Sequence, residues 1–365
     1  MTTKHLFSEF DMDRENFIET QANFQFGACT ALSDAGWKPK PNLTFNPSTE
    51  TTEVNQAQRY IALLGELRAH GLRSPIVAKM GDAMRKPNPF PTFQYNRLQG
   101  TANSILWPLK RFHDIGVRSF CTLPDPAEPA LRDKKPIVFW RGGMRGFSSL
   151  EGNLNVSKLL QKYQQGKIDD DRFIAHLRTV PRYAFVSRFF DAEGFDIGLR
   201  QGEGGRGNIA LCNDLPVIAR YNKEFVPPAE QLQYKYLISI QGKDVGSSFG
   251  WQLGTNSVLL KEDYPWEVFF DCHLKAWEHF VPVAQDFSDV QEKVAWCEDN
   301  PAACEAMVEK RHAIVHLLLD GEVRREALRR VIERYEDYYR QFGGDRVLIA
   351  NTRNSSFERK TQASL

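Results

Sequence analysis

The stretch from Tyr234 to Val283, YKYLISIQGKDVGSSFGWQLGTNSVLLKEDYPWEVFFDCHLKAWEHFVPV, decides the fold because it joins two apolar runs through a turn rich in glycine and serine. The run Tyr236–Ile240 is short and β-branched, which predicts a buried strand rather than a helix. Asn256–Leu260 predicts a return to strand, and Phe249–Leu253 predicts the opening of a helix between the two. The pattern is therefore strand, turn, helix and strand.

The turn of this unit has the composition of an anion site. Gly246, Ser247 and Ser248 are small, so their backbone N–H groups can approach a phosphate closely. A helix that begins at Phe249 would direct its positive end towards the same anion. The same residues also suit an ordinary strand-turn-helix unit that binds nothing, and the local pattern leaves both interpretations open.

Outward from this unit, short apolar strands alternate with amphipathic helical segments, which predicts an α/β fold with a largely parallel sheet. Further strands are expected at Ser74–Met80 and Pro136–Trp140. Helices are expected at Val54–His70, Asp289–Leu319 and Glu322–Phe342. The chain has 365 residues and is 42% hydrophobic, so two domains are the natural expectation.

Charge and cysteine content exclude several classes of protein. The formal net charge is +1, which gives no field that would attract nucleic acid. The N-terminal residues are charged where a signal peptide would be apolar, and no uninterrupted membrane span follows. The six cysteines show no CxxC pair, so free thiols are expected, and no metal is expected. We expect a cytoplasmic protein, with peripheral contact to the inner face of the membrane left open.

Several motifs, in order, resemble glycosyltransferase family 90. LKAWEHFVPV is similar to the family's LKPWVHYVPV, and Asn256-Ser257-Val258 is similar to the SNS of its bacterial members. Phe139–Gly143, FWRGG, is similar to the family's FWRG strand end, and most of residues 134–320 follow the family's order. The secretory members carry signal peptides and disulfides, so the resemblance favours the bacterial branch, which builds lipopolysaccharide cores.

The resemblance implies a GT-B fold, in which two Rossmann-like domains face each other across a cleft. It implies an N-terminal acceptor-side domain at 1–134, a donor nucleotide-sugar domain at 135–334 and a polar tail at 351–365, with a C-terminal helix at 335–350 returning to the first domain. The implied reaction is metal-independent, inverting transfer of a hexose or pentose from a UDP-sugar to a hydroxyl of a saccharide or glycolipid acceptor. No cofactor beyond the donor substrate is expected.

Inverting transfer requires a base for the acceptor proton and a pocket for the departing diphosphate. By the family's order of strand, Asp-containing loop and strand, Asp82 is the predicted base, although Ala83-Met84 replaces the usual aromatic residue and proline. A loop carboxylate that caps a turn is the structural alternative, and Asp125 and Asp114 are rivals.

The predicted donor-binding residues lie in two loops that would converge beyond the carboxyl ends of parallel strands. Animal members carry an arginine at the position of Ser248, so backbone N–H groups, Lys243, Arg141 or Arg145 must neutralise the diphosphate here. Arg141 could instead form an interior ion pair. Asn96 and Arg97 are predicted near the sugar. The full donor set is Arg141, Gly142, Gly143, Arg145, Lys243, Val245, Gly246, Ser247, Ser248, Asn256 and Ser257.

Two other functions stay open at the sequence level. A nucleotide-sugar or glycan binding protein could keep the fold and lose catalysis, as the absent arginine at Ser248 suggests. A protein-modifying transferase is the third reading, and the charged N-terminus disfavours it. Trp251 and Trp277 are expected in the core, because aromatic residues more often pack than bind.

Overall fold

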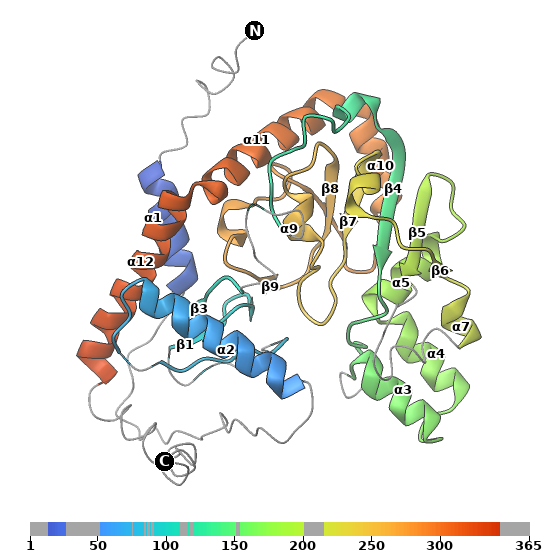
Figure 1. The fold of residues 1–365 in the computed structure, drawn as a ribbon. Helices are drawn as coiled ribbons and strands as arrows, with labels where there is room; N and C mark the ends of the chain where they lie inside the picture. The colour runs from blue at the N-terminus through green and yellow to red at the C-terminus, as the bar shows by residue number, and fades with distance from the viewer. Residues whose placement is uncertain are drawn as a thin grey trace. The chain divides into compact units, whose positions relative to one another are not determined.

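The computed structural model describes residues 14–26, 52–74, 76–83, 85, 88, 91–109, 116, 120–150, 154–200 and 215–343 (Figure 1). They divide into two compact units. Unit 1 is Met1–Asp11, Phe112–Trp266 and Leu274–Leu319, and unit 2 is Met12–Arg111, Glu267–His273 and Asp320–Leu365. The division at Phe112 does not coincide with the predicted boundary at residue 134. Asp114, residues 344–350 and the predicted tail at 351–365 lie outside the described residues.

Unit 1 is built on a six-stranded sheet in which every strand is parallel, as predicted. The strand order across the sheet is β10-β8-β7-β4-β5-β6. Counted along the chain from β4 and read from the β6 edge, this order is third, second, first, fourth, fifth, sixth, which is that of the Rossmann fold. The strands are β4 (Lys135–Gly142), β5 (Phe195–Arg200), β6 (Asn222–Lys223), β7 (Tyr234–Ser239), β8 (Val258–Glu262) and β10 (Val281–Val283).

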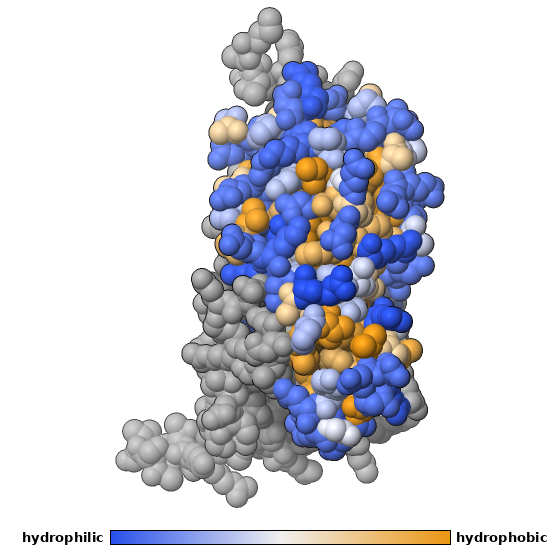
Figure 2. All heavy atoms as spheres, turned by 90° about the vertical axis from the view of Figure 1, so that its right-hand side faces the viewer, coloured by the Kyte–Doolittle hydropathy of each residue, from blue (hydrophilic) through white to orange (hydrophobic). Residues whose placement is uncertain are grey.

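Helices pack their apolar faces on this sheet, and one hydrophobic core joins the strands to them. The face of the molecule in Figure 2 is mostly hydrophilic, with apolar side chains near its middle. The helices of unit 1 are α3 (Val156–Gln164), α4 (Asp170–Arg178), α5 (Pro181–Phe189), α7 (Pro216–Ala219), α8 (Pro228–Gln231), α9 (Phe249–Gln252), α10 (Val290–Asp299) and α11 (Pro301–Leu319). Short 3-10 turns occupy Leu131–Asp133 in unit 1 and Asp271–His273 in unit 2.

Capping residues explain where several helices begin. The Asn155 side chain accepts a hydrogen bond from the Lys158 N–H (2.9 Å) at the start of α3. Asp169 does the same for the Arg172 N–H (2.8 Å) at the start of α4. Proline at the first position of α5 and of α11 removes an N–H that no helical carbonyl could accept.

Unit 2 packs helices on a small parallel pair of strands. Its core joins Leu67 of α2, Phe93 of β1, Ile105 of β3 and Tyr335 of α12. The elements are α1 (Arg14–Phe26), α2 (Thr52–Ala69), β1 (Thr92–Gln94), β2 (Arg97–Leu98), β3 (Ser104–Leu106), α12 (Gly321–Tyr338) and a π-helical turn (Tyr339–Gly343), while β9 (Trp266–Glu267) lies at the division between the units. No helix in the described ranges of either unit is both long enough and apolar enough to cross a membrane.

Two predicted elements differ from the structure. The strand expected at Ser74–Met80 is reduced to a single bridge between Ala78 and Phe93, although Phe93 exchanges backbone hydrogen bonds with both neighbours of Ala78. The helix expected at Asp289–Leu319 is two helices, because Pro301 lacks the N–H needed to continue α10.

A buried arginine organises the chain that leads into β8. The Arg311 guanidinium on α11 is fully buried and donates to four backbone carbonyls, with no carboxylate partner among the described residues. Burial lowers the pKa of Arg311 to about 9. The accepting carbonyls belong to Leu253 (2.9 Å), Thr255 (2.6 Å), Ser257 (2.8 Å) and His279 (3.3 Å).

We expect Arg311→Met to destabilise unit 1 by roughly 3–5 kcal/mol, because four carbonyls lose the guanidinium inside the protein and the His312 ring remains near only that of Thr255 among the described contacts. Urea unfolding followed by tryptophan fluorescence measures the loss. The matched control is Arg178→Met at an exposed position of α4, which should change stability by less than about 0.5 kcal/mol. Equal midpoints for the two variants would contradict the role assigned to Arg311.

Candidate functional site

Two loops meet where the strand order of the sheet reverses. β4 and β7 are neighbours, yet the chain leaves β4 towards β5 and leaves β7 towards β8. In open parallel sheets, ligands bind beyond the carboxyl ends of the strands at such a point. The loops concerned are Gly143–Gly146 after β4 and Ile240–Ser248 after β7.

Arg182, near the start of α5, joins these loops. Its Nη1 donates to the Gly143 carbonyl (2.8 Å), and its Nε donates to the Gln241 carbonyl (3.1 Å). Its Nη2 lies 3.4 Å from the Ile240 carbonyl. The side chain is buried, so the three bonds hold the loops in one relative position.

Arg145 is the second cation at this point. It is exposed, and among the described residues its side chain has no hydrogen bond or ion pair. Burial first, and then the nearby Arg145 charge, lower the pKa of Arg182 to about 10. A Cβ on Gly242 would lie 3.2 Å from the Arg182 Nη2 and 4.0 Å from the Arg145 Cβ, so both arginines border the same glycine. Two like charges at one place favour binding of an anion.

A buried carboxylate lies under the second loop. Glu262, the last residue of β8, accepts from the backbone N–H of Gln241 (2.8 Å) and from its side-chain amide (2.5 Å). Burial raises the pKa of Glu262 to about 7, against the opposing effects of the Gln241 bonds and of Arg182. The charge on this carboxylate therefore changes near neutral pH.

Glycine is required in the second loop, where the chain folds back on its own strand. A Cβ at Gly246 would collide with the Ser239 hydroxyl and lie 2.9 Å from the Ile240 carbonyl. That hydroxyl is buried and has no hydrogen-bond partner among the described residues. The expected helix is present as α9 but has only four residues, so its dipole gives the loop little support. Lys243, Val245, Ser247 and Ser248 all lie in this loop, as predicted from the sequence.

Arg141 does not reach this site. Its Nη2 binds the Asp196 carboxylate on β5 (2.7 Å), and its Nη1 donates to the carbonyls of Asp196 (2.9 Å) and Trp140 (3.0 Å). The side chain is only 7% exposed. The sequence left two roles open for Arg141, a diphosphate contact or an interior ion pair, and the structure shows the ion pair. The diphosphate role does not fit this arrangement.

Asn256 and Ser257 lie at the opposite edge of the sheet, because they precede β8 whereas the loops follow β4 and β7. The Asn256 N–H donates to Glu128 (2.7 Å), and the Ser257 hydroxyl donates to the Tyr234 carbonyl (2.8 Å). Glu128 also accepts from the buried Lys134 ammonium (2.7 Å). These bonds fix the start of β8, so the predicted donor contact of Asn256 and Ser257 does not fit their position.

Asp82, the predicted base, lies in unit 2 with two donors on one oxygen. Its Oδ1 accepts from the Tyr95 hydroxyl (2.6 Å) and from Arg59 (3.0 Å). The carboxylate is 36% exposed, so an acceptor hydroxyl can reach it. The next residue, Ala83, has a φ of 54°, a conformation that alanine rarely adopts. The bonds from Tyr95 and Arg59 fix the direction of the carboxylate.

Arg97 and Asn96, the other predicted residues of unit 2, are bonded internally, and the rival base Asp125 is exposed. Arg97 is buried and binds Glu267 (2.8 Å) and the carbonyls of Ser104 and Phe24 (both 2.9 Å). Asn96 is fully buried, with its amide 3.4 Å from the Gly81 carbonyl. Asp125 is exposed and caps a turn through the Ala127 N–H (2.9 Å).

Comparison with known proteins identifies a family. Residues 212–339 match the model of Glycosyl transferase family 90. The chain is 33% identical over 257 residues to O-glucosyltransferase LpsA of Dichelobacter nodosus, a match over 68% of this chain and 63% of that protein. Residues 212–339 are therefore assigned to glycosyl transferase family 90.

One family relative is Protein O-glucosyltransferase 3 of Homo sapiens, 32% identical over 68 residues, which are 19% of this chain and 13% of that protein. Uncharacterized protein 035R of Invertebrate iridescent virus 3 is 33% identical over 97 residues, covering 26% of this chain and 9% of that protein. The crystal structure of TarM aligns with a TM-score of 0.34 and 9% identity over 65% of this chain and 39% of that one, too slight a likeness to argue the fold from.

Two residues of the site, Arg182 and Glu262, were absent from the sequence-based set. Arg182 follows Pro181 in a helical segment between β4 and β5, and nothing in its local pattern distinguishes it from a surface arginine. Glu262 ends a strand next to Asp263, where a carboxylate is commonly exposed. Only the strand order brings both side chains to the two loops.

The raised pKa of Glu262 predicts a pH-dependent stability. Because the folded state binds the proton more tightly than the unfolded chain, the parent protein should lose stability as pH rises from about 5 to above 7. Relative to Glu262→Gln, we expect a loss of up to roughly 3 kcal/mol across that window. Urea midpoints at a series of pH values measure it, with Glu305→Gln at an exposed position of α11 as the control. Parallel curves for the parent and Glu262→Gln would show that the carboxyl titrates normally.

Proposed function

We propose that this chain is a glycosyltransferase that moves a hexose or pentose from a UDP-sugar to a hydroxyl of a saccharide acceptor, with inversion at the anomeric carbon. One observation carries the proposal: Arg145 and Arg182 converge at the point where a sheet of Rossmann order reverses. Family membership supports the reaction class. In the GT-B arrangement that we propose, unit 1 binds the donor and unit 2 supplies the acceptor side.

The diphosphate would bind between the two loops. Arg145 supplies a charge that can move onto the phosphate oxygens, because it has no partner among the described residues. Arg182 already donates to three carbonyls, so it mainly positions the loops and adds a fixed positive charge. The backbone N–H groups of Gly246–Ser248 would complete the set. Stabilising the departing UDP in this way lowers the barrier to breaking the glycosidic bond.

Asp82 would act as the base on the acceptor side. As the acceptor oxygen attacks the anomeric carbon, its proton passes to the Asp82 carboxylate, and the bond from that carbon to the phosphate oxygen breaks. Arg59 and Tyr95 orient the carboxylate by binding Oδ1. UDP leaves from the opposite face, which inverts the anomeric centre.

The acceptor that we propose is a lipopolysaccharide or another surface glycan. LpsA, an O-glucosyltransferase, matches over far more of this chain than does Protein O-glucosyltransferase 3. We further propose a cytoplasmic location, because Cys121, Cys272, Cys297 and Cys304 are free thiols, as in a reducing compartment.

Replacing the unpaired cation tests the donor site. Arg145→Met should weaken binding of UDP by roughly 10- to 100-fold, because a charge-assisted hydrogen bond to phosphate is lost. Isothermal titration with UDP at two salt concentrations measures the affinity and its salt dependence. The exposed Arg178→Met serves as the control and should bind like the parent. Unchanged affinity in Arg145→Met would place the diphosphate elsewhere.

The second test concerns the base. Asp82→Asn should lower turnover by roughly 10²- to 10⁴-fold while the affinity for UDP is kept, because only proton transfer is removed. UDP release from UDP-glucose, UDP-galactose and UDP-xylose, with core oligosaccharide as acceptor, measures turnover. Asp125→Asn is the matched control. Full turnover in Asp82→Asn would reject the assignment, and UDP binding without turnover in the parent would favour a binding protein.

A further inference from the structure

A pocket lies in unit 1 away from the proposed donor loops. Its volume is about 580 Å³. Its tryptophan Trp277 precedes β10, so it belongs to the amino edge of the parallel sheet, whereas the loops extend from the carboxyl edge. The lining residues come from the turn before β10 and from helices α10 and α11: Trp277, Glu278, Trp296, Ala303, Ala306, Met307 and Lys310.

The sequence analysis placed Trp277 in the core, and this prediction is wrong. The side chain is 41% exposed. Its φ is 65°, a left-handed conformation that costs a bulky residue roughly 1–3 kcal/mol. The turn holds this conformation through the bond from the Trp277 N–H to the Phe280 carbonyl (2.7 Å) and through Arg311, which binds the His279 carbonyl (3.3 Å). The indole packs on Trp296 and leaves part of its surface exposed. Strain of this kind is concentrated at functional sites.

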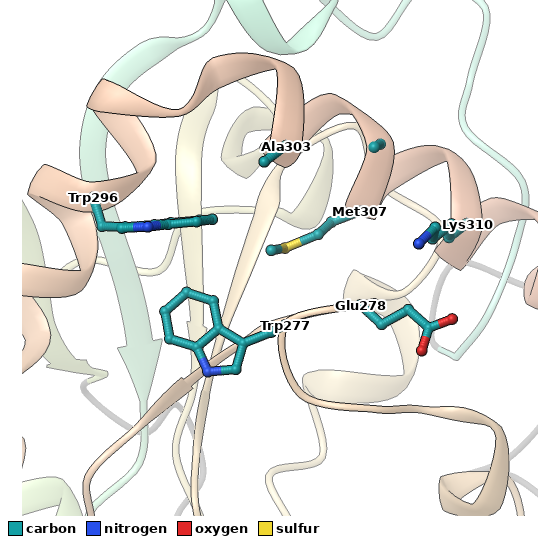
Figure 3. Close-up of a pocket in the computed structure, with 7 residues that line it drawn as sticks. Trp277, Glu278, Trp296, Ala303, Met307 and Lys310 are labelled. Carbon is teal, nitrogen blue, oxygen red and sulfur yellow. The ribbon is translucent and has the colours of Figure 1, made fainter.

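The two ends of the pocket differ in chemistry (Figure 3). At one end the rings of Trp277 and Trp296 meet edge to face, with centroids 4.8 Å apart, and the Lys293 ammonium lies 4.9 Å from the Trp277 ring centre. At the other end are Lys310 and Glu278.

The charged end of the pocket is available to a ligand. In the described part of the chain, the Lys310 ammonium makes no hydrogen bond or ion pair. Among the residues that the structure describes, the Glu278 carboxylate has one ion pair, a long contact with the exposed Lys275 (3.6 Å), and pairs of this kind contribute little. A ligand that fits both ends must therefore combine an apolar face with hydrogen-bonding groups.

We propose that this pocket binds a pyranose residue of a glycan, at a site separate from the donor loops. A pyranose ring carries C–H groups on one face, which pack against an indole, and hydroxyls at its rim, which a carboxylate and an ammonium can bind. The rigid indole pair loses little conformational freedom on binding, because Trp296, Lys293 and the strained turn already fix Trp277. The inference does not depend on the proposed transferase activity.

Saturation-transfer NMR on the full chain tests the site, with methyl β-glucopyranoside, methyl β-galactopyranoside and lactose as probes. We expect transfer to the ring C–H protons of at least one probe, and no loss of it when UDP is added in excess. Trp277→Gly should lower the affinity by roughly tenfold, because the stacking surface is removed. The same variant should unfold at no lower temperature than the parent, since glycine relieves the strain at this φ.

Lys310→Met keeps the apolar end and removes the cation, so it should weaken binding of the sugar without changing stability. Arg145→Met serves as the control for the donor site and should leave the sugar signal intact. The proposal is overturned if no probe binds, if UDP displaces the sugar, or if Trp277→Gly binds as well as the parent. Binding of 1-octanol with displacement of the sugar would also overturn it, because the pocket would then be a site for alkyl chains.

Discussion

The buried guanidinium of Arg182 is the constraint on which the proposed donor site depends. The loops after β4 and β7 are far apart in the sequence. The pairing of β4 with β7 brings together only the first residues of the two loops. By donating to carbonyls of both loops, Arg182 fixes their relative position before any ligand binds. A site formed in this way is organised in advance, so a ligand does not have to order the loops on binding.

The same arginine adds a second positive charge beside Arg145, and this charge is not fully compensated. Burial and the Arg145 charge both disfavour a charged Arg182, as its lowered pKa records. Asp244 and Glu262 offset part of this cost, but Glu262 carries its full charge only above neutral pH. A diphosphate anion would relieve the repulsion between the two arginines. The positive field at the switch point should therefore strengthen as Glu262 takes up its proton.

Local patterns predicted strands and loops well but not the partners of long side chains. The apolar run Tyr236–Ile240 and the parallel sheet could be foreseen, because burial on both faces of a strand leaves a continuous signature. Arg141 could not be assigned in the same way. Its conformation depends on Asp196, a residue of the neighbouring strand that only the sheet order places beside it. The partners of Arg182 are carbonyls of two distant loops, which its local sequence does not indicate either.

Position 248 carries serine and not arginine, and a cation on the neighbouring loop can take the place of that arginine. A phosphate is attracted by the summed positive potential of nearby charges rather than by one particular residue. A cation on either loop at the switch point can therefore attract it. Arg145 lies across Gly242 from Arg182, which places positive charge on the first loop instead of the second. Glycine at 242 leaves room for the second loop to lie close to that charge. Had Arg141 been the donor cation, its bond to Asp196 would have to break on every binding event, at a cost that Arg145 does not incur.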